Sequence, residues 1–433
     1  MKGSEKKAVP GFTFIRELGG IKEYRLNANG MRVLLAHDAS VPVAGFMVTY
    51  HVGSRNEATG YTGATHLLEH LMFKGSERFN KKLGNSLDTL MESRGAVINA
   101  TTWFDRTNYY EVVPADTLPL AIEVEADRMR TAQITEEDRA SEMPVVRNEF
   151  ERGENLPGEA LDKEMWAAAF TAHPYHHSTI GWRSDIEQVS IERLQQFYDE
   201  YYWPDNATAT VAGSFDEQDV LSIIGREFGR HPAKPGSYPK MYTTEPEQQG
   251  ERRVRVERSG VDMIGLAHKI PEATHDDIPA LIVLSAILFD QKTSRLYRSF
   301  VDTALATDVE VHCWQFHDPS LFETFVTLAP GTSHEKAEKM LRAEYAKLIS
   351  DGVSASEVKD AKQSLRAQIA ARKDGPYAFL ASLNEDIATG DWTRFVSLPD
   401  ALAAVTPADV KRVAKTYFKD RSSVVGWFVN TAH

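Results

Sequence analysis

One pattern of turns, helices and strands recurs in this chain at a constant spacing. Val189-Ser190-Ile191 opens a stretch of helical periodicity that ends in Tyr201-Tyr202 and leads into an apolar strand, and Val405-Thr406-Pro407 opens a similar stretch in the second half of the chain. Pro114 and Pro330 each close a strand pattern and open a helical one, and they are separated by the same number of positions. Self-similarity at a fixed spacing indicates repeated folding units. The chain is therefore predicted to fold as two copies of one α+β domain.

The length of the chain and one polar stretch suggest where these copies meet. At 433 residues, the chain exceeds what a single hydrophobic core usually supports, which favours two domains of about 200 residues each. Residues 229–250 hold four prolines and three glycines with few apolar residues, a composition typical of a linker. We therefore predict domains at 1–228 and 251–433, joined by this linker. In each domain, a mainly antiparallel sheet is expected to carry helices on one face.

The strongest chemical signal is His66-Leu67-Leu68-Glu69-His70, which lies in a stretch predicted to be helical from about Thr62. Because positions i, i+3 and i+4 of a helix share one face, both imidazoles and the Glu69 carboxylate would project into the same small volume. Two such histidines can each give a nitrogen to Zn²⁺, and the glutamate can take a proton from metal-bound water. This order of residues is the inverzincin signature.

A catalytic zinc needs a third protein ligand, which a chance match to the motif would not require. The Glu-rich stretch Glu136 to Glu154 is predicted to be one long helix, on which Glu142 and Glu149 lie two turns apart on nearly the same face. This helix can supply the missing ligand, although a solvated charged face is the commoner role of such a helix. Pro144 is expected to remove one helical hydrogen bond and to kink the segment.

Local patterns place the motif directly after a core strand. A hairpin around Asn29-Gly30 is expected to open the first domain, followed by a strand over Val43 to Val52 and then by the motif helix. A second hairpin is predicted from residues 96–103 and 108–113, which are rich in β-formers. The second copy has an apolar helix, Ala280 to Phe289, at the place of the motif helix, but it has no His-x-x-Glu-His. The first copy is therefore predicted to be the catalytic one.

Other metal-binding signals are weaker. His173, His176 and His177 invite a second metal site, but a short loop that is broken by Pro174 and lacks a paired carboxylate favours surface or packing roles for them. Cys313 is the only cysteine of the chain. No intrachain disulfide and no cysteine-based zinc site can therefore form.

Charge and hydropathy limit the classes of partner. The net charge of −13 argues against nucleic acid as the main partner, because phosphate binding relies on basic surface. No window approaches the ~18 apolar residues of a membrane span, and the Lys-rich residues 1–10 lack the apolar run of a signal peptide. The chain as written would be cytoplasmic, or periplasmic if it is a mature form whose signal has been removed.

These residues resemble the pitrilysin/insulinase family of zinc metallopeptidases, in particular its short-chain branch with mitochondrial processing peptidase and bacterial two-subunit relatives. In that family, the inverted motif is followed on a later long helix by a glutamate in an Asn-Glu or Arg-Glu context. Glu149, which follows Asn148, fits this description and stands at the family's usual separation from His70. The resemblance spans nearly the whole chain. It implies that His66, His70 and Glu149 hold one Zn²⁺ and that Glu69 is the general base.

The same resemblance implies further site residues. Glu142 matches a second family glutamate, seven residues before the ligand, which is expected to orient the site. Substrate is expected to add as a strand to an exposed sheet edge beside the metal, at Asn99, Ala100 and Thr101. Phe73 resembles the aromatic lining of that cleft. A strand paired on both sides and a core phenylalanine are the alternative interpretations of these positions.

The second copy departs from the family pattern. Family members usually carry an Arg and, seven residues later, a Tyr after a Gly-Leu-Ala run, and these two side chains contact substrate or transition state. Here Leu305 stands seven positions after Arg298, within Ala304-Leu305-Ala306-Thr307. We therefore predict that the chain is the zinc-bearing half of a heterodimer whose companion subunit supplies the Arg and the Tyr.

The resulting hypothesis is a zinc-dependent endopeptidase that hydrolyses peptides or short unfolded polypeptides in an enclosed chamber formed by clamshell halves. A presequence-processing peptidase, which the acidic balance would suit, is one alternative, and a non-catalytic scaffold subunit is another. Glu69 argues against the scaffold, because a scaffold has no physical need for a base at the metal. His₂Glu ligation could also hold Co²⁺ or Mn²⁺.

Overall fold

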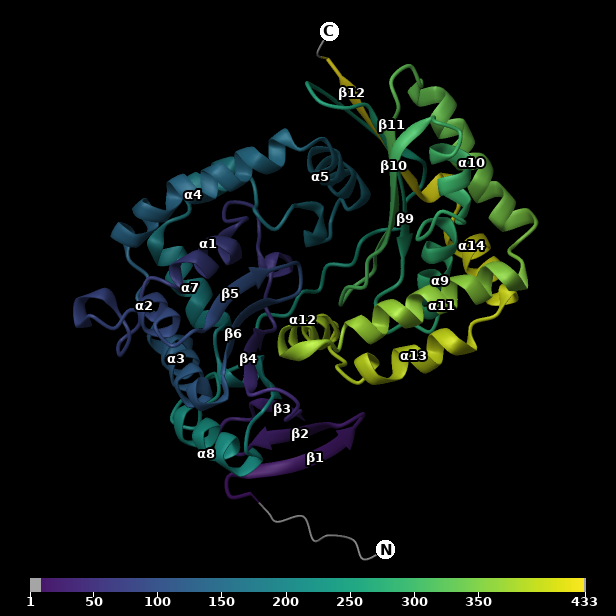
Figure 1. The fold of residues 1–433 in the computed structure, drawn as a ribbon. Helices are drawn as coiled ribbons and strands as arrows, with labels where there is room; N and C mark the ends of the chain where they lie inside the picture. The colour runs from purple at the N-terminus through teal and green to yellow at the C-terminus, as the bar shows by residue number, and fades with distance from the viewer. Residues whose placement is uncertain (1–8, 432–433) are drawn as a thin grey trace, which may run out of the picture. The chain divides into compact units, whose positions relative to one another are not determined.

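The computed structural model of the chain describes residues 9–431 and is drawn in Figure 1. Most of the Lys-rich segment at residues 1–10 lies outside the described residues. The described chain contains two β-sheets and helices packed on them, which confirms the predicted α+β class. Each sheet is mainly antiparallel, as expected.

The first sheet consists, among the described residues, of seven strands in the order β1-β2-β3-β7-β4-β6-β5. The predicted hairpin around Asn29-Gly30 joins β2 to β3, and the φ of 84° at Gly30 explains why glycine stands there. β1 pairs with β2 at the far edge and was not predicted. The strands are β1 (Phe12–Leu18), β2 (Ile21–Leu26), β3 (Arg32–His37), β4 (Val43–Tyr50), β5 (Val97–Thr102), β6 (Thr107–Pro114) and β7 (Ala207–Gly213).

The second sheet repeats the topology of the first. Its order, over the part of the chain that is described, is β10-β11-β9-β12-β8, with a parallel pair of β12 and β8. The first sheet has the same order in β5-β6-β4-β7-β3, with a parallel pair of β3 and β7. The predicted duplication is therefore confirmed by strand order. The strands are β8 (Arg252–Arg258), β9 (Met263–Ile270), β10 (Ala306–Cys313), β11 (Ser320–Leu328) and β12 (Ser423–Asn430).

The helices follow the same repeat. The interval from the start of α7 at Ile191 to the start of α14 at Pro407 equals the interval from α3 at Leu118 to α10 at His334. The helices are α1 (Ala64–Leu71), α2 (Leu87–Glu92), α3 (Leu118–Thr131), α4 (Glu136–Asn155), α5 (Pro157–Ala169), α6 (Arg183–Gln188), α7 (Ile191–Tyr201), α8 (Glu217–Glu227), α9 (Ile278–Leu288), α10 (His334–Ser350), α11 (Ala355–Ala371), α12 (Gly375–Ala388), α13 (Arg394–Ala404) and α14 (Pro407–Tyr417).

The chain divides into two compact units that do not follow its linear order. The first unit comprises the chain up to residue 146 with residues 179–241 and 372–388, and the second comprises residues 147–178, 242–371 and 389 onward. Helix α12 thus belongs to the unit of the first sheet, and α5 belongs to the unit of the second (Figure 1). The division into domains at 1–228 and 251–433 stays a prediction.

Helix α12 covers the face of the first sheet that the other helices leave open. A Cβ on Gly45 would lie 2.5 Å from the Cδ1 of Leu380, so the strand needs a glycine where α12 approaches. Met47 and Tyr110 pack with Leu380 on this face. Phe46, the neighbour of Met47 in β4, points to the opposite face and packs against Phe228.

Helix α5 covers the second sheet in the same way. A Cβ on Gly265 or Gly426, which are paired across β9 and β12, would lie 2.4 or 2.6 Å from the Sδ of Met165. The flanking residues Ile264 and Val425 point to the other face, into the buried core formed with α9, α10, α11, α13 and α14. The sequence predicted helices on one face of each sheet. The structure adds a helix on the second face of each sheet, α12 on the first sheet and α5 on the second.

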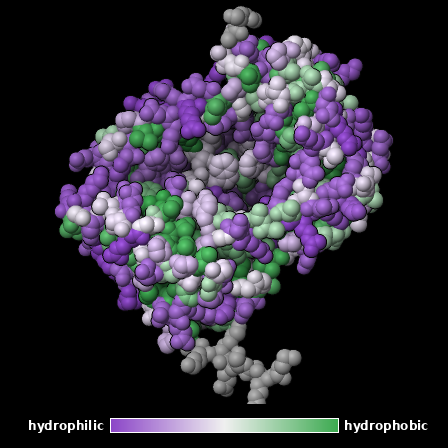
Figure 2. Space-filling model, in the orientation of Figure 1, coloured by the Kyte–Doolittle hydropathy of each residue, from purple (hydrophilic) through white to green (hydrophobic). Residues whose placement is uncertain are grey.

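Two further features bear on the predictions. Pro144 lies inside α4, which continues as a helix from Glu136 to Asn155, so the proline does not end it. Within residues 9–431, none of the helices combines the length and the apolarity that crossing a bilayer would require. The face of the molecule shown in Figure 2 is mostly hydrophilic, with hydrophobic residues in scattered groups.

Candidate metal centre

Helix α1 follows β4 and carries the inverted motif. Its apolar side chains Leu67, Leu68 and Leu71 are fully buried, and this burial fixes the rotation of the helix. The three polar motif residues, at positions 66, 69 and 70, are only partly buried. The helix therefore presents both imidazoles and the carboxylate on the side that faces away from the sheet core.

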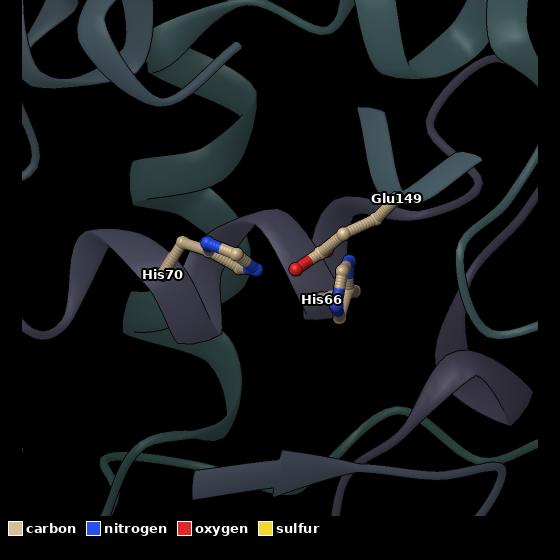
Figure 3. A group of neighbouring side chains, drawn as sticks. All are labelled: His66, His70 and Glu149. Carbon is tan, nitrogen blue, oxygen red and sulfur yellow. The ribbon is translucent and has the colours of Figure 1, made fainter. Parts of the chain in front are cut away.

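His66, His70 and Glu149 lie close together in the structure. One candidate ligand atom from each of these side chains lies within 4.8 Å of the others. Figure 3 shows the two imidazoles of α1 and the Glu149 carboxylate converging on one point. Among residues 9–431, no other trio of His, Cys, Asp or Glu gathers in this way. Glu149 lies on α4, so the continuous helix fixes its position relative to Glu142.

The electrostatics of the two histidines suit metal binding. Burial lowers the pKa of His66 to about 3, with a smaller contribution from His70. The His66 imidazole is therefore neutral at pH 7, which is the form that binds a metal. The two rings are nearly perpendicular, with centroids 4.8 Å apart, so their nitrogens can approach one ion from different directions.

Glu142 holds His70 from the side away from the site. Its Oε2 lies 3.1 Å from His70 Nδ1, and its Oε1 forms an ion pair with Lys74. Burial alone would raise the pKa of Glu142, but the hydrogen bonds from Lys74 and His70 outweigh it and lower this pKa. A carboxylate on Nδ1 favours the tautomer whose Nε2 can bind a metal. The role of Glu142 in orienting the site stays a prediction.

Glu69 contacts the edge strand of the first sheet. Thr102, the last residue of β5, donates a hydrogen bond from its Oγ1 to Glu69 Oε2 at 2.5 Å. A carboxylate that accepts a hydrogen bond at one oxygen is held in one orientation. The role of Glu69 as a general base stays a prediction.

The predicted substrate strand is an edge strand. β5 pairs with β6 along one side and ends the sheet, so its other side has no strand neighbour within the sheet. Asn99 and Thr101 point to one face and are exposed, whereas Ala100 is buried on the α1 face. The alternative of a strand paired on both sides is excluded for the described sheet.

Phe73 lies just after α1 and is partly buried. Its ring packs 6.0 Å from the ring of Tyr109, and the Arg128 guanidinium lies 5.1 Å from its centroid. Arg128 is itself fully buried and paired with Glu125 and Glu111. Phe73 thus covers a buried charged cluster, and its role in lining the cleft stays a prediction.

The three histidines of residues 173–177 make local contacts. His173 accepts a hydrogen bond from the Tyr175 N–H and pairs with Asp318 at 3.0 Å. His176 Nδ1 lies 3.0 Å from the His173 carbonyl, and His177 Nδ1 lies 3.1 Å from the Ser178 carbonyl. These contacts favour the packing role over a second metal site.

The segment in which the family tyrosine is expected, Ala304-Leu305-Ala306-Thr307, holds no tyrosine. Arg298 lies in the short helical turn Tyr297–Val301, and Leu305 follows it with its N–H bonded to the Phe300 carbonyl. Ala304 between them has a φ of 54°, which is unusual for a residue other than glycine. The chain itself therefore offers no phenol at this position.

Sequence reasoning missed several contacts of the site. Lys74 on Glu142, Thr102 on Glu69 and the capping of α1 by Glu57 were not predicted. Arg106 was missed as well: it donates to the carbonyl and the hydroxyl of Thr101 and to Glu385 of α12. Side chains along β5 alternate between the two faces of the sheet, but no sequence signal shows which face contacts α1.

The repeated α+β fold and the inverted metal motif define a class of protein, the inverzincin-type metallopeptidases. Residues 32–182 match the insulinase family (peptidase family M16), and residues 188–365 match the peptidase M16 inactive domain. The chain belongs to peptidase family M16. The match of the second copy to an inactive domain agrees with its lack of the motif.

Relatives cover most of the chain. It is 30% identical to the zinc protease PqqE of Helicobacter pylori over 381 residues, which is 87% of this chain and 85% of that protein. It is 26% identical to a probable mitochondrial-processing peptidase subunit beta of Schizosaccharomyces pombe, over 92% of this chain and 89% of that protein. The crystal structure of a protease from Helicobacter pylori superposes with a TM-score of 0.89 at 27% identity, covering 97% of this chain and 100% of that one.

Proposed function

We propose that the chain is a zinc-dependent endopeptidase that hydrolyses peptides or short unfolded polypeptides. The observation that carries the proposal is the convergence of His66, His70 and Glu149, with Glu69 on the same turn of α1. Several relatives of the chain are named zinc proteases, which supports zinc as the metal. Because His₂Glu ligation also suits Co²⁺ and Mn²⁺, the metal content of the purified protein decides among them.

The residues of the site fit a catalytic zinc. His66, His70 and Glu149 would hold the zinc, which when bound would supply an acidified water and polarise a carbonyl. His66 is neutral at pH 7, and Glu142 orients His70. Glu69 is proposed as the general base that accepts the proton of the attacking water and passes it to the leaving amine.

Substrate is proposed to bind as an added strand along β5. The outer side of β5 has no strand neighbour in the sheet, and Thr102 at its end contacts the proposed base. Backbone hydrogen bonds from Asn99 to Thr101 would hold an extended peptide beside Glu69. Phe73 is proposed to contact substrate near this strand, and the enclosed chamber implied by the family resemblance remains a prediction.

The decisive experiment replaces Glu69 by Gln. We expect Glu69→Gln to retain the metal and to lose turnover by at least about a hundredfold, because the amide cannot act as a base. Metal content and hydrolysis of a fluorogenic peptide should be measured on the same preparation. Near-normal turnover would refute the role of Glu69, and loss of metal would assign this residue to the ligands instead.

The companion subunit is a separate part of the proposal. No tyrosine stands seven positions after Arg298 or directly after Ala304-Leu305-Ala306, so a second chain is proposed to supply the Arg and Tyr that contact substrate. The purified chain should be assayed alone and together with the product of a neighbouring M16 gene. Full activity of the lone chain would refute the heterodimer without affecting the proposed metal centre.

Presequence processing is the second candidate function. The similarity to a probable mitochondrial-processing peptidase subunit beta and the net charge of −13 favour it, since presequences are basic. A peptide-library cleavage profile separates presequence processing from general peptide hydrolysis. Cleavage that shows no preference for basic residues would exclude presequence processing. A scaffold role is the further alternative, and it would be supported if the chain neither bound metal nor cleaved any peptide.

A further inference from the structure

Two carboxylates hold the start of the motif helix α1. Glu57 Oε2 accepts a hydrogen bond from the Gly63 N–H at 2.7 Å, and Glu57 Oε1 accepts one from the Thr65 N–H at 2.7 Å. Asp185, which lies in α6, accepts the N–H groups of Gly60 and Thr62 at 3.0 and 3.2 Å. The two residues thus bind four amides of the short segment that leads into α1.

The loop itself cannot supply this cap. The residue that precedes α1 is Gly63, which has a φ of 82° and no side chain to accept the first amides of the helix. A Cβ at this position would lie 2.3 Å from the carbonyl oxygen of Ile180, so no capping side chain fits there. Glu57 performs the capping from six residues upstream, and it is 5% exposed.

The capped turn is also the turn that carries the first candidate ligand. His66 is the third residue of α1, and the N–H group bound by Glu57 Oε1 is that of Thr65, the residue just before it. The first turn of a helix carries partial positive charge, which would oppose a cation held by His66. An acceptor carboxylate at this end offsets that charge and fixes the backbone from which the imidazole projects.

Two effects act on the ionisation of Glu57 in opposite directions. Burial raises the pKa of Glu57 to about 8, while hydrogen bonds from Thr65 and Gly63 lower it. Both oxygens accept backbone N–H groups, a geometry that suits the carboxylate rather than the acid. Asp185 lies closer to the surface and accepts the Thr62 hydroxyl at 2.8 Å in addition to its amides.

We propose that Glu57 and Asp185 are positioning residues that preorganise the first turn of α1 for the metal and so set the metal affinity of His66. This proposal rests on the proposed function, because it assumes that His66 is a ligand. Outer partners that orient a ligand typically change metal affinity by 10- to 100-fold when they are replaced. Neither residue touches the metal or substrate directly.

The test measures metal affinity and stability separately on the full chain. Metal-stripped wild type, Glu57→Gln and Asp185→Asn are titrated with Zn²⁺ against a chromophoric chelator, and thermal unfolding of the metal-free proteins is recorded. Asp216→Ala is the matched control, because Asp216 caps α8 of the same unit by accepting the Gln218 and Asp219 amides at 2.8 and 2.9 Å. It should lower the unfolding temperature and leave zinc affinity unchanged.

We expect Glu57→Gln to weaken zinc binding at least about tenfold and Asp185→Asn to weaken it less. Zinc affinity of Glu57→Gln within twofold of wild type would overturn the proposal if His66→Ala abolishes binding. If His66→Ala also binds zinc normally, the proposed metal centre is refuted, and this inference is refuted with it. If Glu57→Gln fails to fold, the zinc affinity of Asp185→Asn tests the proposal instead. A zinc affinity of Asp185→Asn equal to that of wild type would refute the proposal.

Discussion

The hydroxyl of Thr102 donates a hydrogen bond to Glu69 at 2.5 Å, and this contact joins the end of the edge strand β5 to the motif helix. The strand that is proposed to receive substrate therefore also orients the proposed base. Removal of the hydroxyl should leave Glu69 in several orientations, of which few are productive.

We accordingly predict that Thr102→Val lowers kcat about tenfold and changes KM little, since a hydrogen bond to a charged group typically contributes about 1.5–3 kcal/mol. Thr102→Ser should restore most of the activity. In the Glu69→Gln background, Thr102→Val should have no further effect. Thr49→Val serves as the control, because the Thr49 hydroxyl bonds Asn384 on the α12 face of the same sheet. An equal loss in both single variants would indicate general destabilisation instead.

Glu142 bonds His70 and Lys74, which predicts a role in metal retention. Glu142→Gln should release zinc at least about tenfold faster to excess chelator, because the amide no longer favours the metal-binding tautomer of His70. Lys74→Met should have a smaller effect in the same assay. Glu137→Gln, on the exposed side of the same helix, is the control. Equal release rates for Glu142→Gln and wild type would contradict the prediction.

Arg106 connects β5 to α12. Its guanidinium donates to the Thr101 carbonyl at 3.0 Å and forms an ion pair with Glu385 at 2.6 Å. We predict that Arg106→Leu raises KM severalfold with a smaller change in kcat, because the edge strand loses a contact that fixes its carbonyl. Amide hydrogen exchange of β5 should become faster in the same variant. Unchanged exchange and unchanged KM would show that other contacts hold the strand.

Stability should depend on pH through a buried pair of carboxyl groups in the second unit. Trp166 and Trp314 both donate to Glu323 Oε2, at 3.2 and 2.6 Å. Burial raises the pKa of Asp162, which faces Glu323, to about 7, and burial also raises that of Glu323. An unfolded aspartate has a pKa near 3.9, so the folded chain binds the extra proton between about pH 4 and pH 7.

The free energy of unfolding should therefore fall as the pH rises through this window. We predict that Asp162→Asn flattens the dependence of the unfolding temperature on pH between 5 and 7.5, measured on the metal-free protein. The exposed Asp308 provides the control, since Asp308→Asn should keep the wild-type slope. A wild-type slope in Asp162→Asn would show that Asp162 is ionised throughout.

The sequence revealed the features that depend on spacing. The recurrence of one pattern along the chain predicted two sheets of one topology, and the motif with Glu149 predicted three side chains that the structure does bring together. Helical periodicity fixes which residues share a face, so the two histidines of α1 could be grouped from the sequence alone. Nothing comparable marks Glu57, since the usual capping residue before α1 is absent and the cap comes from a distant loop position.

The covering of each sheet could not be predicted for a related reason. The periodicity of α12 shows that Leu380 and Leu383 belong to a buried side, but not which sheet buries them. Gly45 and Gly265 mark the places where a helix approaches closely, yet a glycine in a strand also signals a bulge or a bend. Only the tertiary packing of α12 and α5 determines which sheet each helix covers and why each glycine is needed.

The assignment of α12 to the first unit has a consequence for how the chain is made. Until α12 has been synthesised, the sheet face around Gly45 and Met47 has no helix to shield it. A nascent chain must keep this face soluble until residues 375–388 emerge. The shortest fragment that could carry a fully covered first sheet therefore reaches Ala388, and expression of the first copy alone should yield an aggregation-prone product.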